Sequence, residues 1–252
     1  MGYFRLLLSL VIMQAHTSVP GNHYALANLA VLLLYAISGY GCTAAMQGRY
    51  RGRPLLFLAN RYLRLWPTYA IVFGLSCWLM LWVPVPLASI PRGWAWVANL
   101  LMLRADAVPV AWVLPYMLLG YVAIAVGGSA TARRAGVWLL VSFAWAQHQA
   151  FLLDWGGYYS SLAAGSLAYS VGAAIYWLGL VVPRDQGLGH LAGAIAFPVF
   201  LVHFPVQAVL PLFAGWPLFF ATLPPTMALS WALWRFVEVP TARYRKALRS
   251  NP

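Results

Sequence analysis

The chain has 252 residues, of which 63% are hydrophobic and 8% are charged, and its formal net charge is +12. A soluble domain of this length carries more charge on its surface, so the composition excludes an ordinary soluble globular protein. The apolar runs are continuous rather than alternating, which favours membrane-spanning helices over a β-barrel. The sequence therefore predicts an all-α polytopic transmembrane bundle, with residues 1–252 forming a single domain.

Apolar runs of roughly 20 residues recur along the chain, which is the length that crosses about 30 Å of hydrocarbon as a helix. Turn residues separate the runs, beginning with Pro20-Gly21-Asn22. Between the third and fourth runs, the tryptophan-bearing residues 89–107 are typical of an interfacial or re-entrant segment. The eight predicted spans are residues 3–19, 26–46, 68–86, 108–127, 136–153, 161–182, 194–213 and 217–237.

The basic residues predict the orientation of these spans. They gather in loops 47–67 and 128–135 and in the C-terminal tail, and of the 16 only Arg92 and Arg104 fall on the opposite side. Because cytoplasmic loops are rich in Lys and Arg, both termini are expected in the cytoplasm, in a protein integral to the bacterial inner membrane. The same clustering favours contact with anionic membrane lipids over nucleic-acid binding.

A signal peptide is the alternative interpretation of the N-terminus, with Arg5 as its charged region and residues 6–13 as its apolar region. Against it, no A-x-A cleavage site precedes Pro20. Removal of this segment would also spoil the even number of spans that the charge distribution supports.

Arg5 and His16 are the most informative polar residues of the first predicted span. Eleven positions at about 100° each bring both side chains to one helix face, about 16 Å apart along the axis. Charged or titratable groups are costly in lipid, which suggests that this face lines a cavity used for chemistry or transport. A neutral imidazole can take a proton from a hydroxyl group or accept an acyl group. The alternatives are a structural histidine at the helix end and a topology-setting arginine.

Arg61 and Arg64 lie three residues apart and would share one face of a helix at the cytoplasmic rim. Guanidinium groups match phosphate geometry, so the pair is a candidate clamp for a phosphate-rich cofactor that enters from the cytosol. Ordinary positive-inside charge is the alternative explanation. Ser38 and Gly39 interrupt an apolar helix, where close packing against a neighbouring helix is the default explanation and exposure of backbone to a ligand is the functional one.

The other polar residues restrict the classes of function that the sequence allows. His148 and His203 lie in predicted spans, and each alone is more typical of an interhelical hydrogen bond. None of the four acidic residues lies clearly inside a span, which argues against a proton-driven transporter. Cys42 and Cys77 lack metal-ligand spacing, so neither a metal site nor a disulfide framework is expected.

Five short segments, in this order, resemble motifs of the acyltransferase-3 family of membrane O-acyltransferases. Each is weak alone, and the resemblance covers essentially residues 3–245. The segments are Arg5-x10-His16, Tyr35-Ala-Ile-Ser38-Gly39-Tyr40, Phe57-x3-Arg61-x2-Arg64-x2-Pro67-x-Tyr69, Phe200-Leu-Val-His203-Phe-Pro205 and Phe236-Val-Glu238-Val-Pro240.

The resemblance implies an enzyme that takes an acyl group, here expected to be acetyl, from cytoplasmic acyl-CoA. The acceptor would be a hydroxyl of a cell-surface glycan, a lipid-linked glycan or a similar molecule. It implies His16 as the catalytic residue and general base. It further implies donor binding by Arg5, Arg61 and Arg64, with Ser38 and Gly39 as further candidates, and no metal.

Two departures from the family pattern leave other functions open. The family often shows a glutamate in W-S-L-x-x-E, where this chain has Met117, so the protein either lacks this group or replaces it with Asp106 or Asp154. The family usually has about ten helices, and eight spans are predicted here. A transporter or flippase lined by Arg5 and His16, and a non-catalytic family member, are therefore the alternative hypotheses.

Overall fold

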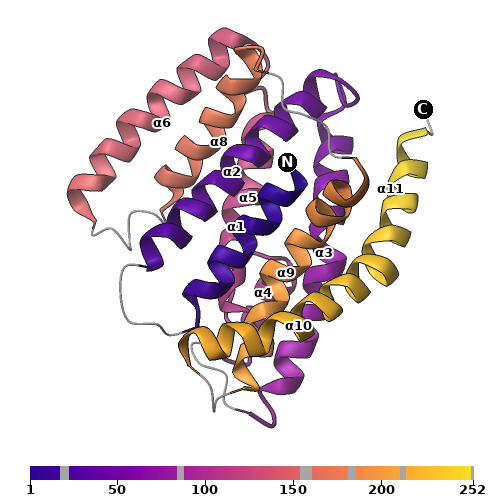
Figure 1. Ribbon diagram of the computed structural model, residues 1–252. Coiled ribbons are helices and arrows are strands. Elements are labelled where there is room, and N and C mark those ends of the chain that lie inside the picture. The colour runs from indigo at the N-terminus through magenta and orange to yellow at the C-terminus, as the bar shows by residue number, and fades with distance from the viewer. Residues whose placement is uncertain (18–22, 84–87, 154–160, 181–185, 211–213, 251–252) are drawn as a thin grey trace. The chain divides into compact units, whose positions relative to one another are not determined.

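The computed structural model describes residues 1–17, 23–83, 88–153, 161–180, 186–210 and 214–250. All regular secondary structure in these ranges is helical, which confirms the predicted all-α class (Figure 1). The chain forms two compact units. The first unit comprises residues 1–30, 63–115 and 184–252, and the second comprises residues 31–62 and 116–183.

The helices of the described ranges follow one another with short connections. In chain order they are α1 (Gly2–Ala15), α2 (His23–Gln47), α3 (Pro54–Leu79), α4 (Trp94–Leu100), the 3-10 helix η1 (Pro109–Trp112), α5 (Val113–Ala125), α6 (Ala132–Leu152), α8 (Leu162–Trp177), α9 (Gly187–Ala208), α10 (Gly215–Leu233), the π-helix η2 (Trp234–Glu238) and α11 (Val239–Ser250).

Two of these helices are long and apolar enough to cross a membrane, Ala25–Gln47 within α2 and Gly187–Ala208, which is α9. Three shorter apolar segments are Gly2–Ala15, Pro109–Ala125 and Leu162–Trp177. Each overlaps a predicted span. The number of eight spans, the cytoplasmic termini and the bacterial inner membrane stay predictions.

The predicted loop 47–67 is wrong in its second half. Helix α3 begins at Pro54, far before the predicted start of the third span at residue 68. Proline is favoured in the first turn of a helix because its fixed φ suits the helix and its missing N–H is not needed there. Arginine is a good helix former, so the arginines of this stretch do not end the helix. The third span was predicted to begin later because these arginines interrupt the apolar run. Arg61 and Arg64 therefore lie on a helix, as predicted for their shared face.

In the first unit, α1 packs along α9, and α9 packs against α10. The two helices lie close together at Gly2, where a Cβ atom would lie only 1.7 Å from the carbonyl oxygen of Gly189. Further along, the Ser9 hydroxyl donates to the Ala196 carbonyl at 3.0 Å. The Gln207 side-chain amide donates to the Met13 carbonyl, also at 3.0 Å. Small residues and side-chain hydrogen bonds thus contribute to the contact between these two helices.

In the second unit, α6 packs along α8 and the later part of α2 packs against α8 (Figure 1). A Cβ atom on Gly39 would lie 2.3 Å from the Tyr169 carbonyl oxygen, and one on Gly172 would lie 1.9 Å from the Ala36 carbonyl oxygen. Neither helix can carry a side chain at these positions without moving apart. The structure thereby supplies a packing reason for Gly39.

We expect Gly172→Ala to lower the midpoint of thermal unfolding of the purified protein in detergent, because the added methyl group overpacks the contact between α2 and α8. The expected loss is about 1–3 kcal/mol of unfolding free energy. Gly41→Ala is the matched control, since a Cβ atom there meets nothing within 4 Å and the substitution favours the helix. Equal midpoints for the two variants would contradict this packing.

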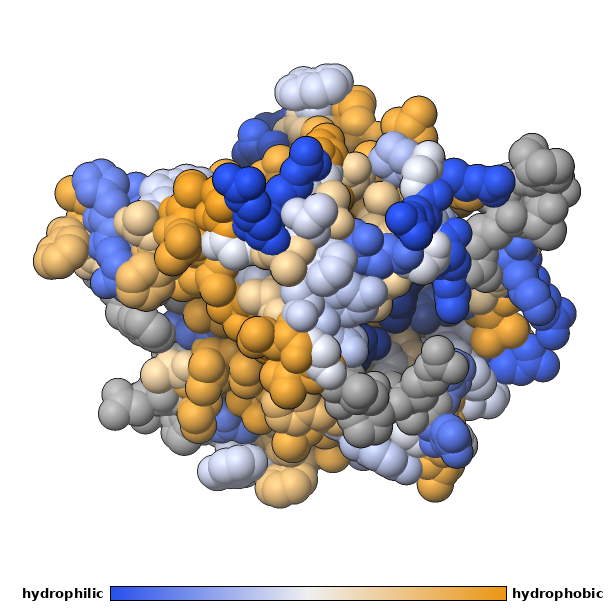
Figure 2. Space-filling view, turned by 90° about the horizontal axis from the view of Figure 1, so that it is seen from above, coloured by the Kyte–Doolittle hydropathy of each residue, from blue (hydrophilic) through white to orange (hydrophobic). Residues whose placement is uncertain are grey.

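Large apolar side chains remain exposed on the described helices. On α6 they include Leu140, which is 70% exposed, together with Val137, Val141 and Phe143. Figure 2 shows broad apolar areas open to the surroundings. Monomeric soluble proteins rarely expose such areas, and they mark contact with a membrane or a partner. Cys42 and Cys77 are both buried.

Candidate active site

His16 lies directly after the last residue of α1, which is shorter than the predicted span 3–19. The Thr17 hydroxyl donates to the Gln14 carbonyl at 2.6 Å and satisfies one of the last carbonyl groups of the helix. The His16 ring turns back along α1, with its Nδ1 atom 2.8 Å from the Ile12 carbonyl oxygen. His16 is partly exposed, so its other ring nitrogen, Nε2, is the one that can meet a ligand.

His203 of α9 lies beside His16 in the first unit. The two ring centroids are 5.2 Å apart and the rings are inclined at 51°. The side chain of His203 is fully buried, and its Nδ1 atom lies 3.2 Å from the Val199 carbonyl oxygen. Its Nε2 atom is buried and makes no hydrogen bond to any residue of the described ranges. Phe204 contacts the His16 ring edge-on, at 6.0 Å between centroids.

The same arrangement fixes the tautomer of both rings. A backbone carbonyl accepts only, so each Nδ1 atom carries a proton and each neutral ring has its lone pair on Nε2. The neutral His16 ring can therefore act as a base at a partly exposed position. The His203 imidazole lies beside it and is fully buried. From the sequence alone, His203 is predicted to make an interhelical hydrogen bond. The signal that could have pointed to a place in the site is its position in the segment Phe200-Leu-Val-His203-Phe-Pro205.

Arg5 and Arg64 belong to the first unit with His16. Arg5 lies near the start of α1 and is partly exposed, and its carbonyl accepts a hydrogen bond from the Ser9 hydroxyl at 3.1 Å. Arg64 is exposed on α3. Both guanidinium groups are placed where a charged ligand could reach them.

Glu238 lies at the end of η2, beside α3. The Thr68 hydroxyl donates to its carboxylate at 3.3 Å. Burial raises the pKa of Glu238 to about 7, against the opposing effects of the Arg64 charge, the Thr68 hydrogen bond and the Arg245 charge. Single π-turns often occur at functional sites. Glu238 is thus the one acidic side chain of the described ranges whose pKa is raised toward neutrality.

Arg61, Ser38 and Gly39 belong to the second unit. The Arg61 guanidinium stacks over the Phe57 ring at 5.2 Å and donates to the Gly41 carbonyl at 3.5 Å, a long hydrogen bond. Ser38 is partly exposed and Gly39 is buried against α8. A site that joins these three residues to Arg5, His16 and Arg64 stays a prediction.

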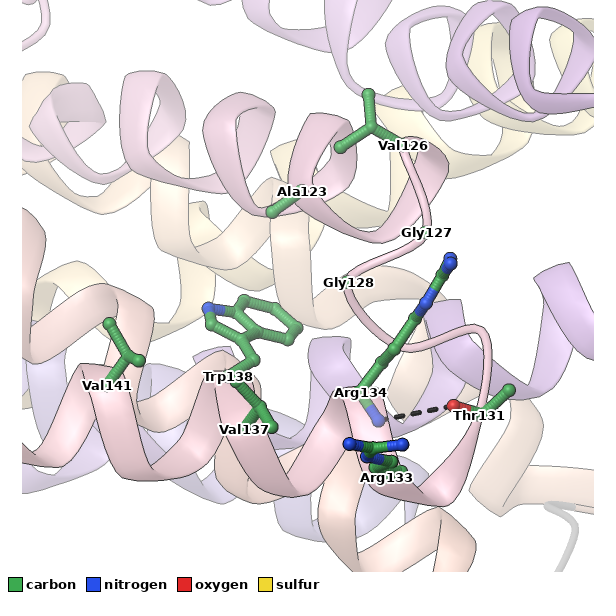
Figure 3. Close-up of a pocket in the computed structure, with 10 residues that line it drawn as sticks. All are labelled: Ala123, Val126, Gly127, Gly128, Thr131, Arg133, Arg134, Val137, Trp138 and Val141. Atoms are coloured by element: carbon green, nitrogen blue, oxygen red, sulfur yellow. Dashed lines mark hydrogen bonds between the residues drawn. The ribbon is translucent and has the colours of Figure 1, made fainter.

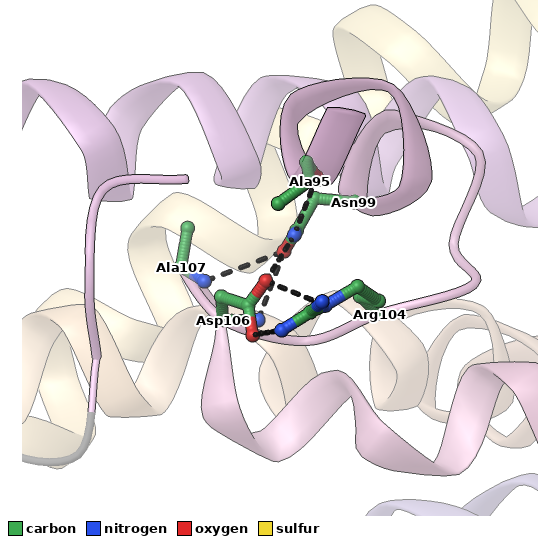
Figure 4. A network of polar contacts seen from close by, with 5 residues as sticks. All are labelled: Ala95, Asn99, Arg104, Asp106 and Ala107. Carbon is green, nitrogen blue, oxygen red and sulfur yellow. Dashed lines mark hydrogen bonds and ion pairs between the residues drawn. The ribbon is translucent and has the colours of Figure 1, made fainter. Parts of the chain in front are cut away.

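Asp106 is engaged in a loop of the first unit (Figure 4). The Arg104 guanidinium binds both of its carboxylate oxygens, at 2.9 and 3.0 Å. The buried Asn99 amide donates to the carboxylate at 2.7 Å and accepts from the Asp106 backbone N–H at 2.9 Å. Although burial alone would raise the pKa of Asp106, the hydrogen bonds from Arg104 and Asn99 and the Arg104 charge lower it. These contacts give Asp106 a structural role in the loop. Asp154, the other candidate replacement for the glutamate of the family pattern, lies outside the described residues.

No cluster of three or more metal-binding side chains occurs within the described ranges. Comparison with protein-family models, with characterised proteins and with solved structures finds no match for this chain.

Proposed function

We propose that this protein is an integral-membrane O-acyltransferase that moves an acetyl group from cytoplasmic acetyl-CoA to a hydroxyl of a cell-surface or lipid-linked glycan. The observation that carries the proposal is the His16 imidazole. Its Nδ1 atom is held by the Ile12 carbonyl, its Nε2 atom is left as a base, and the ring is partly exposed beside His203. General bases of this kind accelerate proton transfer near neutral pH.

In the proposed reaction, His16 Nε2 takes the proton of the acceptor hydroxyl as its oxygen attacks the thioester carbonyl of acetyl-CoA. The tetrahedral intermediate collapses with cleavage of the carbon–sulfur bond, and the leaving CoA thiolate takes the proton from the His16 imidazolium. The products are the O-acetyl ester and CoA, and the enzyme returns to its starting state. Positioning of the two substrates supplies a further large share of the acceleration.

The arginines support binding of the donor. CoA carries a pyrophosphate and a 3′-phosphate, and Arg guanidinium groups bind phosphate oxygens in pairs. In this proposal Arg5, Arg61 and Arg64 are the residues that bind the donor phosphates, with Ser38 and Gly39 as further candidates. We expect these arginines on the cytoplasmic side, where CoA is available, because cytoplasmic loops are rich in basic residues.

The membrane arrangement belongs to the same proposal: eight spans, both termini in the cytoplasm and insertion in the bacterial inner membrane. It is supported by the two helices of membrane-spanning length, the shorter apolar helices and the exposed apolar side chains. Short helices such as α1 suit a bundle that encloses a polar reaction site reachable from the cytosol.

The test uses inner-membrane vesicles from a bacterial strain that produces the full chain, and vesicles from the same strain without it. We expect added [14C]acetyl-CoA to release free CoA and to label the glycan or glycolipid fraction only where the chain is present. Uptake of glycan without consumption of acetyl-CoA would instead indicate a transporter. Failure of the purified protein to bind CoA would indicate a non-catalytic protein, and either result would overturn the proposal.

A further inference from the structure

A groove of about 960 Å³ lies in the second unit, between the end of α5 and the start of α6 (Figure 3). It has two chemically different parts. Its floor is apolar and comes from both helices, through Ala123, Val126, Val137 and Val141. Its other part is basic and is formed by Arg133 and Arg134 in the first turn of α6.

The local structure places both arginines at the mouth of this groove. Gly127 has a φ of +98°, a left-handed conformation that glycine adopts without strain, and it reverses the chain after α5. The Thr131 hydroxyl then caps α6 by accepting from the Arg134 backbone N–H at 3.2 Å. Figure 3 shows the Arg134 side chain extended from α6 toward Gly127 across the groove.

Among the residues that the structure describes, none that lines the groove carries a negative charge to balance these two arginines. The first turn of α6 contains no acidic residue, and no acidic side chain lines the groove. Cations are unfavourable at a helix N-terminus, where the helix dipole and the open N–H groups attract anions. Arg133 and Arg134 are also exposed, so a phosphate can approach both of them. An anion seated here would be bound by two guanidinium groups and the helix end together.

We propose that this groove binds an anionic glycerophospholipid, with its phosphate on Arg133 and Arg134 and one acyl chain along the apolar floor. Guanidinium groups pair with phosphate oxygens in a bidentate manner, and a soluble phosphate would have no use for the apolar floor. Basic pockets next to membrane helices on the cytoplasmic side are the usual place for anionic headgroups. The inference rests on the membrane arrangement given under the proposed function, and it uses none of the residues of the proposed acyl transfer.

The experiment is a lipid titration of the purified full chain in mild detergent, followed by native mass spectrometry. The two probes are phosphatidylglycerol and phosphatidylcholine with the same acyl chains. We expect the wild-type protein to bind phosphatidylglycerol about tenfold more tightly. The double variant Arg133→Gln/Arg134→Gln should bind both lipids equally. The double variant Arg51→Gln/Arg53→Gln is the control, because it removes the same charge from exposed positions of the same unit and should keep the preference.

A groove-filling variant, Ala123→Phe, tests the floor while both arginines remain. We expect it to weaken binding of both lipids, and its thermal midpoint shows whether it is folded. An equal loss of preference in the two arginine variants would overturn the proposal in favour of general surface charge. Binding of inorganic phosphate or CoA that displaces the lipid and is unaffected by Ala123→Phe would overturn it in favour of a soluble anion.

Discussion

Replacing His16 by alanine is expected to lower acetyl transfer by about 10²–10⁴-fold, which is the usual contribution of a positioned general base. The variant loses the only Nε2 lone pair that the proposed mechanism uses, while α1 keeps its packing on α9 because Ser9, Met13 and Gly2 carry that contact. The measurement is the initial rate of CoA release at saturating acetyl-CoA, in vesicles that contain equal amounts of protein. We expect the rate to fall and the thermal midpoint to change little.

His148→Ala is the matched control. His148 is an exposed histidine on α6 in the second unit, and the proposed mechanism gives it no role. Its substitution removes the same chemical group and should leave the rate of transfer unchanged. If folded His16→Ala protein transfers acetyl groups at the wild-type rate, His16 is not the base and the mechanism is wrong.

Replacing Glu238 by glutamine is expected to remove a pH dependence of stability. Burial raises the pKa of Glu238 to about 7, against the Arg64 charge and the Thr68 hydrogen bond, whereas an unfolded glutamate titrates near 4.3. As the pH rises from about 4 to about 7, the unfolded chain loses this proton and the folded chain keeps it. The free energy of unfolding of the wild-type protein therefore falls over this range, by about 1–3 kcal/mol. Glutamine stays neutral throughout and should abolish this fall.

The measurement is the midpoint of thermal unfolding in detergent at several pH values between about 4.5 and 8.5. Asp106→Asn is the control in the same unit. Because the pKa of Asp106 is lowered, its stabilising effect is complete above the unfolded pKa near 3.9 and is lost only as the pH falls through the lower folded value. Asp106→Asn should therefore keep the wild-type slope above pH 4.5, and an unchanged slope in Glu238→Gln would refute the raised pKa of Glu238.

The two long apolar helices were predictable because their signal is local. An unbroken run of apolar residues specifies a helix in lipid whatever surrounds it. Helix α2 begins and ends within three residues of the predicted limits, whereas α9 begins seven residues before the predicted start at 194 and ends five residues before the predicted end at 213. Helix α3 was predicted 14 residues too short at its N-terminal end because its arginines interrupt that run, although they do not interrupt the helix.

The candidate site likewise combines features that could be predicted from one segment of the sequence with contacts that could not. The apolar helix that carries Arg5 was readable from the sequence, but it ends at Ala15, so His16 lies one position beyond the helix that was expected to place both residues on one face. The contact of His16 with His203, 187 residues later, was not readable from spacing, because it depends on how closely α1 approaches α9 at Gly2 and Ser9. The groove between α5 and α6 likewise depends on the turn at Gly127 that sets the two helices side by side.

The helical class, the approximate positions of the apolar helices, and a histidine and several arginines that are costly in an apolar segment could all be read from the sequence. Helix packing and loop conformation bring His16 next to His203, half-bury Glu238 beside Thr68 and hold Asp106 against Arg104 and Asn99, and none of these contacts could be predicted from the sequence. The two kinds of feature differ in the distance along the chain over which the underlying interactions act. Hydrophobicity and helix periodicity act within one segment, whereas burial and hydrogen bonding between segments arise only when the helices pack.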